Sequence, residues 1–326
     1  MNDFNAGQQK ISGVLVTGAN GYIGKSFVNQ ITPASGAVVT LDKFDGVVRP
    51  GVDHYVGDFG DEIILNKILR RYDIHSVIHL AALKSVSESI VDPLSYLEVN
   101  YVKTMNMFRV LSEVGLQRMI FASSAAVYAE KISRRNPLIS ESDKILPASP
   151  YGVSKIAAEY FLESACQSYQ SVVALRIFNV AGIYPGLTIS SGAVNMLCDI
   201  AVNGGTFHLK RNSKGGTTLD SVRDYISVGE VASAISAVLD SHPTPGFSAV
   251  NICSGVGTSI KDLIALVEEK FGKKIQVVQS DKIIDEASFV VGNPILAFDK
   301  VGFSSKESLD SIVGNFLLNV CRQASE

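Results

Sequence analysis

The chain has 326 residues, of which 46% are hydrophobic and 19% charged, and its net charge is −3 at pH 7. A chain of this length can bury a sizeable core as one large or two modest domains. The nearly balanced charge gives no electrostatic basis for binding nucleic acid or an anionic membrane surface, so we predict neither as a partner.

Cysteine and histidine usage indicates a reduced protein without a metal. The sequence has no Cys-x-x-Cys pair, and its five histidines have no helical ligand spacing. We therefore expect no metal site, and reduced thiols in a cytoplasmic protein. The N-terminal residues are polar and no uncharged apolar run reaches about 18 residues, so we expect neither a signal peptide nor a membrane-spanning helix. The cysteines are Cys166, Cys198, Cys253 and Cys321.

The first predicted elements are a buried strand at residues 14–17 and a helix at 25–31, joined by a glycine turn at residues 18–24. Gly18, Gly21 and Gly24 permit a tight turn and a close approach of backbone N–H groups to a pyrophosphate. The helix N-terminus adds partial positive charge. As a bare pattern Gly-x-x-Gly-x-x-Gly is weak, but its place between a strand and a helix predicts a dinucleotide site.

A second apolar strand at residues 37–41 ends in Asp42. An acid in this place can accept hydrogen bonds from both adenosine ribose hydroxyls and repels a 2′-phosphate, so we predict NAD rather than NADP. An aspartate here can also serve only as a turn residue, and the adjacent Lys43 weakens the charge argument.

Further strands are predicted at residues 77–80, 118–122 and 172–176, alternating with helical patterns. This order is typical of an α/β fold with a doubly wound parallel sheet, in which ligands bind beyond the carboxyl ends of the strands. Small residues follow the first of these strands, and Ser123 and Ser124 follow the second. The Ser124 hydroxyl can donate and accept a hydrogen bond, although both serines could equally cap a turn.

Tyr151 and Lys155 lie four residues apart, on one face of a predicted helix. An ammonium near a phenol stabilises the phenolate and lowers its pKa, so Tyr151 could act as a general base. The spacing alone occurs by chance in many helices. Its combination with the glycine turn and Ser124 is what favours a catalytic role.

Together these residues resemble the extended short-chain dehydrogenase/reductase family, and within it the UDP-glucose (UDP-galactose) 4-epimerases. The resemblance extends from the glycine turn to about residue 256 and includes segments 79–89, 123–128, 149–155, 223–226 and 251–257. It implies that NAD contacts Gly18, Gly21, Tyr22, Ile23, Gly24, Asp42, Asp58, Phe59, Leu80, Ala81, Ala82, Lys84, Asn100, Ser123, Tyr151, Lys155 and Phe178. It implies contacts of a nucleotide-sugar substrate with Lys84, Ser124, Tyr151, Asn179 and Arg223.

The resemblance also implies a reaction. Tyr151 would remove the proton of the sugar C4 hydroxyl, directly or through Ser124, as tightly held NAD takes the C4 hydride. Lys155 would hold the nicotinamide ribose and tune Tyr151. The transient 4-keto sugar would turn over and accept the hydride on its other face, so that C4 is inverted. The protein's part is orientation and proton management.

Departures from the epimerase pattern concern the nucleotide. The segment between Gly186 and Arg223 is short and lacks the usual Asn-Asn pair, and no second diphosphate-binding arginine occurs near residues 283–291. Losing one charge-assisted arginine contact typically costs about 1.5–3 kcal/mol. Diphosphate binding would rest on Arg223, with Lys210, Arg211 or Lys214 as possible substitutes, so another nucleotide stays open. Val290, at the gate position facing the sugar 2-substituent, does not decide between hydroxyl and N-acetyl.

Three other functions differ from an epimerase in the residues that they require. A 4,6-dehydratase of the same family would carry an Asp-Glu pair where this chain has Ala125 and Ala126, which argues against elimination. A nucleotide-sugar 4-dehydrogenase or reductase keeps the same Ser, Tyr and Lys and stays open. A non-catalytic sensor of NAD(H) would not need these three residues together.

For the architecture we predict an NAD-binding domain at residues 1–178, rejoined by about 223–254, which includes an amphipathic stretch at 228–239 and a strand at 249–253. A smaller C-terminal substrate-binding lobe would comprise residues 179–222 and 255–326, with helices around 263–271 and 309–320. The family resemblance implies a homodimer, with an interface of helices at residues 93–113 and 155–169.

Overall fold

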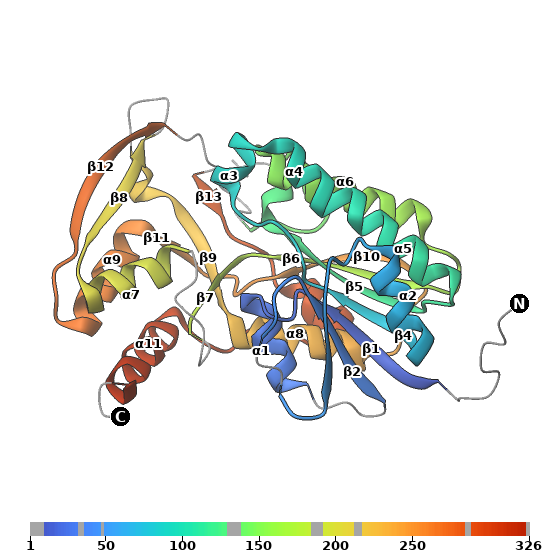
Figure 1. Ribbon diagram of the computed structural model, residues 1–326. Coiled ribbons are helices and arrows are strands. Elements are labelled where there is room, and N and C mark those ends of the chain that lie inside the picture. Colours follow the sequence, from blue (N-terminus) through green and yellow to red (C-terminus); the bar gives the residue numbers. More distant parts are fainter. Residues whose placement is uncertain are drawn as a thin grey trace, which may run out of the picture.

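The computed structural model describes residues 10–31, 36–46, 49–128, 138–183, 192–211, 217–283 and 288–323. In this part of the chain, seven strands form one sheet in which every neighbouring pair is parallel (Figure 1). In spatial order they are β10 (Gly246–Ile252), β6 (Ser171–Ile177), β5 (Arg118–Ser124), β4 (Tyr72–His79), β1 (Ile11–Thr17), β2 (Ala37–Asp42) and β3 (Val52–Val56). The predicted doubly wound parallel sheet is confirmed.

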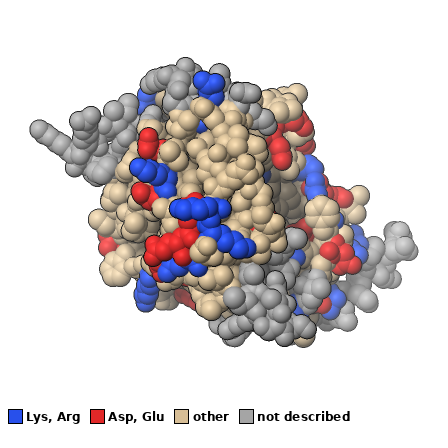
Figure 2. Space-filling model, turned by 90° about the vertical axis from the view of Figure 1, so that its left-hand side faces the viewer, with Lys and Arg blue, Asp and Glu red and all other residues tan. Residues whose placement is uncertain are grey.

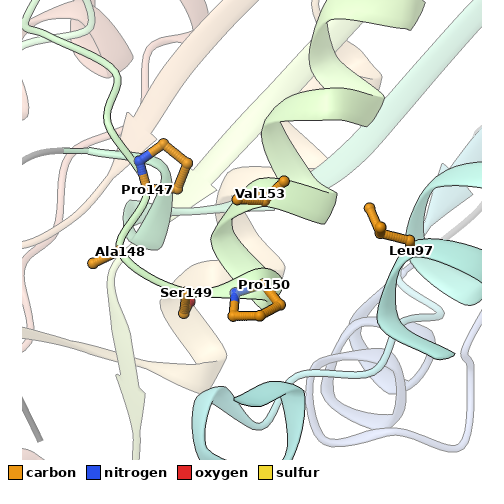
Figure 3. A pocket seen from close by; sticks show the side chains of 6 residues that line it. All are labelled: Leu97, Pro147, Ala148, Ser149, Pro150 and Val153. Carbon is orange, nitrogen blue, oxygen red and sulfur yellow. The ribbon is translucent and has the colours of Figure 1, made fainter. Parts of the chain in front are cut away.

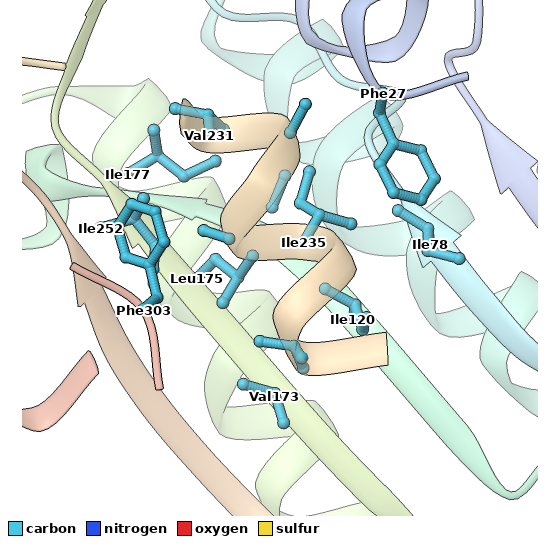
Figure 4. Close-up of a cluster of buried hydrophobic side chains, with 14 of the residues drawn as sticks. Phe27, Ile78, Ile120, Val173, Leu175, Ile177, Val231, Ile235, Ile252 and Phe303 are labelled. Atoms are coloured by element: carbon cyan, nitrogen blue, oxygen red, sulfur yellow. The ribbon is translucent and has the colours of Figure 1, made fainter. Parts of the chain in front are cut away.

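Helices cover both faces of this sheet, because successive strand residues point to opposite sides. Ile120 of β5 packs on the face of α1 and α8 (Figure 4), whereas its neighbour Phe121 packs on the face of α2, α5 and α6. The bounds are α1 (Tyr22–Gln30), α2 (Glu62–Arg71), α5 (Lys103–Glu113), α6 (Pro150–Ala165), α8 (Val228–Asp240) and α10 (Ile295–Val301). Figure 4 shows how Val231 and Ile235 of α8 meet strand residues such as Ile78, Leu175 and Ile252.

Short helices extend the layer around α6. These are α3 (Val86–Val91), α4 (Pro93–Leu97), the π-helical turn η1 (Glu98–Val102) that leads into α5, and the 3₁₀ turn η2 (Ala125–Val127) that follows β5. Each of α3 and α4 begins with a side-chain cap, from Ser85 and Asp92 respectively. These elements surround the N-terminal end of α6, where Tyr151 lies.

A smaller lobe lies at one end of the large sheet (Figure 1). Its strand β9 (Val222–Ser227) pairs with β7 (Asn179–Ala181), β11 (Gly257–Ser259) and β13 (Phe289–Val290), while β8 (Thr206–Arg211) pairs with β12 (Gln276–Ile283). Helices α7 (Ala193–Asn203), α9 (Ile260–Phe271) and α11 (Leu309–Gln323) share a core with these strands, and η3 (Thr218–Asp220) precedes β9. The sequence indicates β9 as the start of the return to the large sheet. In the structure β9 belongs to the small lobe, and α8 and β10 make that return.

The visible surface at this end of the molecule carries acidic and basic side chains intermixed rather than sorted by sign (Figure 2). Ion pairs join Lys270 to Asp310 at 2.7 Å and Lys274 to Glu268 at 2.6 Å. Among the described helices, none has the length and apolar character to cross a membrane. Among the same residues, no group of three or more His, Cys, Asp or Glu side chains could hold a metal ion.

Candidate functional site

The glycine turn between β1 and α1 is built by contacts that leave no room for side chains. Gly18 has φ +71°, and a Cβ there would lie 2.5 Å from the Ala81 backbone nitrogen. A Cβ on Gly24 would lie 2.1 Å from the Gly18 carbonyl oxygen. Both positions therefore require glycine, because backbone fills the space that a methyl group would take. The turn brings the start of α1 against the residues that follow β4.

The N-terminus of α1 is open to an anion. Its N-cap, Gly21, provides no side-chain cap, and the first turn contains no acidic residue. Helix N-termini carry N–H groups without intrahelical partners and partial positive charge, which suits a pyrophosphate. The Tyr22 side chain turns elsewhere: its hydroxyl donates to the Gly182 carbonyl at 2.5 Å and accepts from Asn195 Nδ2 at 3.4 Å. Tyr22 therefore connects the glycine turn to the small lobe.

Asp42 lies at the end of β2, where an adenosine ribose is expected. Its carboxylate accepts hydrogen bonds from the backbone N–H groups of Asn20, at 2.9 Å, and Phe44, at 3.1 Å. These bonds fix the carboxylate at the mouth of the turn. The Lys43 ammonium points to Asp58, at 3.4 Å, and so is committed to another carboxylate. The Lys43 charge is thus paired with Asp58 and does not weaken the preference for NAD over NADP.

The resemblance places Asp58 and Phe59 beside the adenine, but the two residues differ in which of their groups could contact it. Asp58 accepts from Lys103 at 2.5 Å and from the Gly60 N–H at 2.9 Å. Burial raises the pKa of Asp58, but these hydrogen bonds and the two lysine charges outweigh burial and hold the pKa below its usual value. The Phe59 ring is buried against His79 with centroids 4.7 Å apart, so only its backbone could face an adenine.

The loop that follows β4 is held from behind by Asn100. Its Oδ1 accepts from the Leu83 N–H at 2.8 Å, and its Nδ2 donates to the Leu83 carbonyl at 2.9 Å and to Ser154 Oγ at 3.0 Å. Asn100 is buried, so the structure assigns it a supporting role for the loop. On that loop, Lys84 Nζ lies 5.7 Å from the centroid of the Tyr22 ring, and partial burial lowers the pKa of Lys84. Leu80, Ala81 and Ala82 precede it along the edge of the sheet.

Tyr151 lies in the first turn of α6, which begins at Ser149 and Pro150. The Ser149 hydroxyl accepts from the Gly152 N–H at 3.2 Å, and Pro150 occupies a position where no N–H is needed. A Cβ on Gly152 would lie 2.4 Å from the Ala126 carbonyl oxygen. The glycine therefore lets α6 approach η2, and Ser124 lies close enough to the Tyr151 phenol to lower its pKa. The predicted Ser–Tyr pair is brought together.

The predicted effect of Lys155 on Tyr151 is wrong for this structure. Burial raises the pKa of Tyr151, the Ser124 hydrogen bond lowers it less, and the Tyr96 phenol raises it further, so that the pKa lies above its usual value. Lys155 Nζ instead donates to the Ala122 carbonyl at 2.8 Å and lies 4.9 Å from the centroid of the Phe121 ring. Burial lowers the pKa of Lys155 to about 7, against a smaller opposing effect of Glu159. The spacing places both groups on one helix face but does not reveal how deeply both are buried.

Ser123 and Phe178 face the interior. The Ser123 hydroxyl donates to Glu159, and the Phe178 ring packs with Tyr128 at a centroid distance of 6.5 Å. Both side chains are buried, so a cofactor could meet only their backbone. Asn179 Nδ2 donates to the Asp224 carbonyl at 3.0 Å, which ties β7 to β9.

Arg223 lies on β9, in register with Thr258 of β11 and Val290 of β13. Its Nη1 donates to the Val222 carbonyl at 3.0 Å. Lys210 and Arg211 lie on β8, which pairs with β12 rather than with β9, and Lys214 lies outside the described residues. Arg223 therefore stands beside the predicted gate residue Val290, while the proposed substitutes belong to another sheet.

Sequence reasoning missed three buried polar residues around this site. Asp224 accepts four hydrogen bonds that join β9 to two loops, and Tyr96 packs edge-on against Tyr151 at a centroid distance of 6.3 Å. Glu159 forms a buried ion pair with Arg176. The signal was present for the last pair, since Glu159 is four residues beyond Lys155 and Arg176 is a charge inside a predicted buried strand.

A family model decides the relationship. The model described as "NAD dependent epimerase/dehydratase family" matches residues 14–253 of this chain. The chain belongs to this family. The match covers the glycine turn, both serines, Tyr151, Lys155 and Arg223, whereas Val290 lies beyond it.

Individual relatives in the epimerase/dehydratase family agree over nearly the whole chain. A UDP-glucose 4-epimerase of Lacticaseibacillus casei is 30% identical over 317 residues, covering 92% of this chain and 94% of the relative. The structure of a Thermus thermophilus UDP-glucose 4-epimerase in complex with NAD superposes with a TM-score of 0.83 at 26% identity, covering 94% and 99% of the two chains. MoeE5 in complex with UDP-glucuronic acid and NAD superposes with a TM-score of 0.84 at 26% identity, covering 95% and 99%.

Proposed function

We propose that the protein is an NAD-dependent epimerase that inverts C4 of a UDP-hexose through a transient 4-keto sugar. The observation that carries the proposal is the meeting of Ser124, Tyr151 and Lys155 at the edge of the sheet that also holds the glycine turn. Family membership and relatives named UDP-glucose 4-epimerase support this reading.

The residues present suit NAD. The uncapped start of α1 can receive the pyrophosphate, and the Asp42 carboxylate can accept from the ribose hydroxyls while it keeps its two backbone donors. Lys43 is paired with Asp58, so its charge is not directed at a 2′-phosphate beside Asp42. The nicotinamide ring would supply reversible hydride transfer at C4 of the sugar.

The chain itself supplies proton transfer and orientation. The Tyr151 phenol would take the proton of the C4 hydroxyl, with Ser124 as the hydrogen-bonded bridge, and would return it when C4 is reduced again. Because Gly152 lets α6 pack closely on η2, the Tyr151 phenol that accepts the proton is in position before the substrate binds. Elimination is not supported, because Ala125 and Ala126 of η2 cannot transfer a proton.

We propose that the two lobes divide the binding. Residues 1–178 with α8 and β10 would hold NAD, and residues 179–222 and 255–326, together with β9, would hold the sugar nucleotide. Arg223 would bind the diphosphate, and Val290, its partner in register, would face the sugar ring. The UDP-sugars bound by structural relatives support uridine as the nucleotide.

The test is turnover without added cofactor. The purified protein is incubated with a panel of UDP-hexoses and UDP-N-acetylhexosamines, and C4 stereochemistry is followed by proton NMR. Inversion without net NADH supports the proposal and identifies the sugar. Accumulation of NADH with a 4-keto product would mean a 4-dehydrogenase, and bound NAD without turnover of any sugar would mean a sensor. Tyr151→Phe is the control, since it should abolish inversion in an epimerase and leave partner binding by a sensor intact.

We further propose that the protein is a homodimer through the predicted helices at residues 93–113 and 155–169, together with the neighbouring α3. Val91 and Leu94 are 86% and 75% exposed, and Tyr160 of α6 is 58% exposed. An open apolar pocket of about 340 Å³ lies between α4 and the start of α6 (Figure 3). Exposed apolar groups of this kind are typical of an interface. Light scattering should give twice the chain mass for the wild type and a monomer for Leu94→Lys; a monomeric wild type would contradict the proposal.

A further inference from the structure

A short loop at residues 43–46 follows β2 directly after Asp42. The strand pairing reaches as far as Asp42, whose carbonyl accepts from the Gly57 N–H at 2.8 Å. Residues 43–45 are exposed, and the Phe44 ring is 73% exposed. Neither strand pairing nor burial therefore holds these residues. Their position depends on polar contacts, because a segment with little buried apolar surface opens easily without them.

Asn20, in the glycine turn, contacts the end of β2 and the loop through its backbone and its side chain. Its backbone N–H donates to Asp42 Oδ2 at 2.9 Å, and its side-chain Nδ2 donates to the Phe44 carbonyl at 2.7 Å. A carbonyl can only accept, so the amide nitrogen must face it. The Phe44 N–H in turn donates to Asp42 Oδ1 at 3.1 Å. Asn20, Asp42 and Phe44 thus form a closed ring of hydrogen bonds that joins the turn to the loop.

The Asn20 amide fits closely into the space beside Gly46. A Cβ on Gly46 would lie 2.2 Å from Asn20 Oδ1 and 2.5 Å from Asn20 Nδ2. A side chain at position 46 would therefore push the amide away from the Phe44 carbonyl. His54 of β3 also approaches this carbonyl oxygen, with its Nε2 atom at 3.3 Å. The Asn20 contact is the shorter of the two and so the stronger.

We propose that Asn20 is a positioning residue for the cofactor: its amide holds the loop against the glycine turn, so that the Asp42 carboxylate faces the adenosine ribose before NAD binds. The inference deepens the proposed function and rests on it for the place of the ribose at Asp42. When the Phe44 carbonyl is released, the Phe44 N–H can leave Asp42, and the carboxylate loses one of the two backbone donors that fix it. NAD must then order the loop itself, which weakens its binding and speeds its release. Slow release suits the proposed reaction, in which one cofactor serves both the oxidation and the reduction at C4.

Two variants remove the contact in different ways. Asn20→Ala deletes the amide and keeps the backbone N–H that binds Asp42. Gly46→Ala keeps the amide but displaces it, and the fold should tolerate this because the displaced atoms are the end of a side chain. The matched control is Asn29→Ala on α1, which deletes an exposed amide that donates to the Lys25 carbonyl at 2.8 Å. The control removes the same kind of hydrogen bond away from the loop.

The measurement is the release rate of bound NAD, which needs no turnover of a sugar. Protein loaded with NAD that is labelled in the adenine is mixed with an excess of unlabelled NAD, and the label that stays bound is followed in time. A neutral hydrogen bond typically changes an equilibrium by about fivefold. We expect Asn20→Ala and Gly46→Ala each to release NAD about fivefold faster than the wild type. Asn29→Ala should release it at the wild-type rate.

The double variant decides whether the two changes act through the same contact. Asn20→Ala removes the atoms that the Gly46→Ala methyl group would meet, so the two changes together should release NAD no faster than Asn20→Ala alone. Independent effects would multiply to about 25-fold, and that result would overturn the inference. A wild-type release rate in Asn20→Ala would overturn it too, and a wild type that binds no NAD would overturn both the inference and the proposed function. If the variants release NAD as expected but the wild type inverts no UDP-sugar, the proposed function fails and the inference stands.

Discussion

Asp224 offers the sharpest test of how the small lobe is held, because its carboxylate is fully buried and accepts four hydrogen bonds. Oδ1 accepts from the Ser254 N–H at 2.8 Å and the Ser254 hydroxyl at 2.7 Å. Oδ2 accepts from the N–H groups of Gly255, at 2.9 Å, and Gly292, at 3.2 Å. One side chain of β9 thus binds the loop after β10 and the loop after β13. The change to make is Asp224→Asn, which keeps the shape and replaces one acceptor by a donor.

The loss of unfolding free energy in Asp224→Asn depends on which way the new side-chain amide is oriented. If the NH₂ group faces Gly255 and Gly292, two buried N–H groups lose their acceptor. If it faces Ser254, the serine hydroxyl can rotate to accept and only the Ser254 N–H is left unpaired. The second orientation is favoured, and a buried donor without a partner costs about 1–3 kcal/mol. In a chain of 326 residues that corresponds to a fall in thermal midpoint of about 1.5–4.5 °C.

Thermal unfolding followed by circular dichroism measures this fall, with Asp220→Asn as the control because Asp220 of η3 is exposed. Asp220→Asn should unfold with the wild type. Equal midpoints for the two variants would refute the reasoning, since they would mean that the four hydrogen bonds of Asp224 add nothing that an amide cannot replace.

Three further changes probe the site. Gly152→Ala places a methyl group 2.4 Å from the Ala126 carbonyl oxygen and should lower kcat at least tenfold, because α6 must move. The control is Gly229→Ala in the first turn of α8, where the nearest atoms to the new methyl group are 3.8 Å away and kcat should not change. Equal kcat values for the two variants would contradict this. The pKa of Lys155 is about 7 in the folded protein and near 10.5 in the unfolded chain, so between these pH values only the unfolded chain binds the extra proton. The unfolding free energy of the wild type should therefore rise with pH relative to that of Lys155→Met, by up to about 1.4 kcal/mol per pH unit. A difference between the two proteins that does not vary with pH in denaturant titrations would disprove this. Tyr96→Phe removes the acceptor of the Ser85 N–H and should cost about 1 kcal/mol in thermal unfolding. A midpoint equal to that of the wild type would show that water replaces the phenol.

The sequence was sufficient where local rules decide the structure. The strands at residues 14–17 and 118–122 were found because buried parallel strands are continuous apolar runs, and the glycine turn because close backbone contact excludes Cβ atoms. Strand β3 was missed, since Val52–Val56 contains Asp, His and Tyr and is partly exposed at the sheet edge.

The orientation of individual side chains was harder to predict from the sequence. Ser123 and Ser124 are adjacent, yet one hydroxyl faces the buried Glu159 and the other faces Tyr151, a difference set by the twist and end of β5 rather than by residue type. Phe59 was expected beside an adenine, but its ring fills the core against His79. The expected pKa of Tyr151 had the wrong sign because the depth of burial depends on helices packed around α6, which no local pattern encodes.

The Tyr22 hydroxyl has a consequence for how the two proposed ligands affect each other. It belongs to the turn that would receive the pyrophosphate, yet it holds the Gly182 carbonyl and Asn195 of the small lobe. A movement of the small lobe must therefore either carry the start of α1 with it or break this contact. A sugar nucleotide that stabilises the state with this contact intact raises the affinity for the dinucleotide. Because linkage is reciprocal, the dinucleotide raises the affinity for the sugar nucleotide by the same factor.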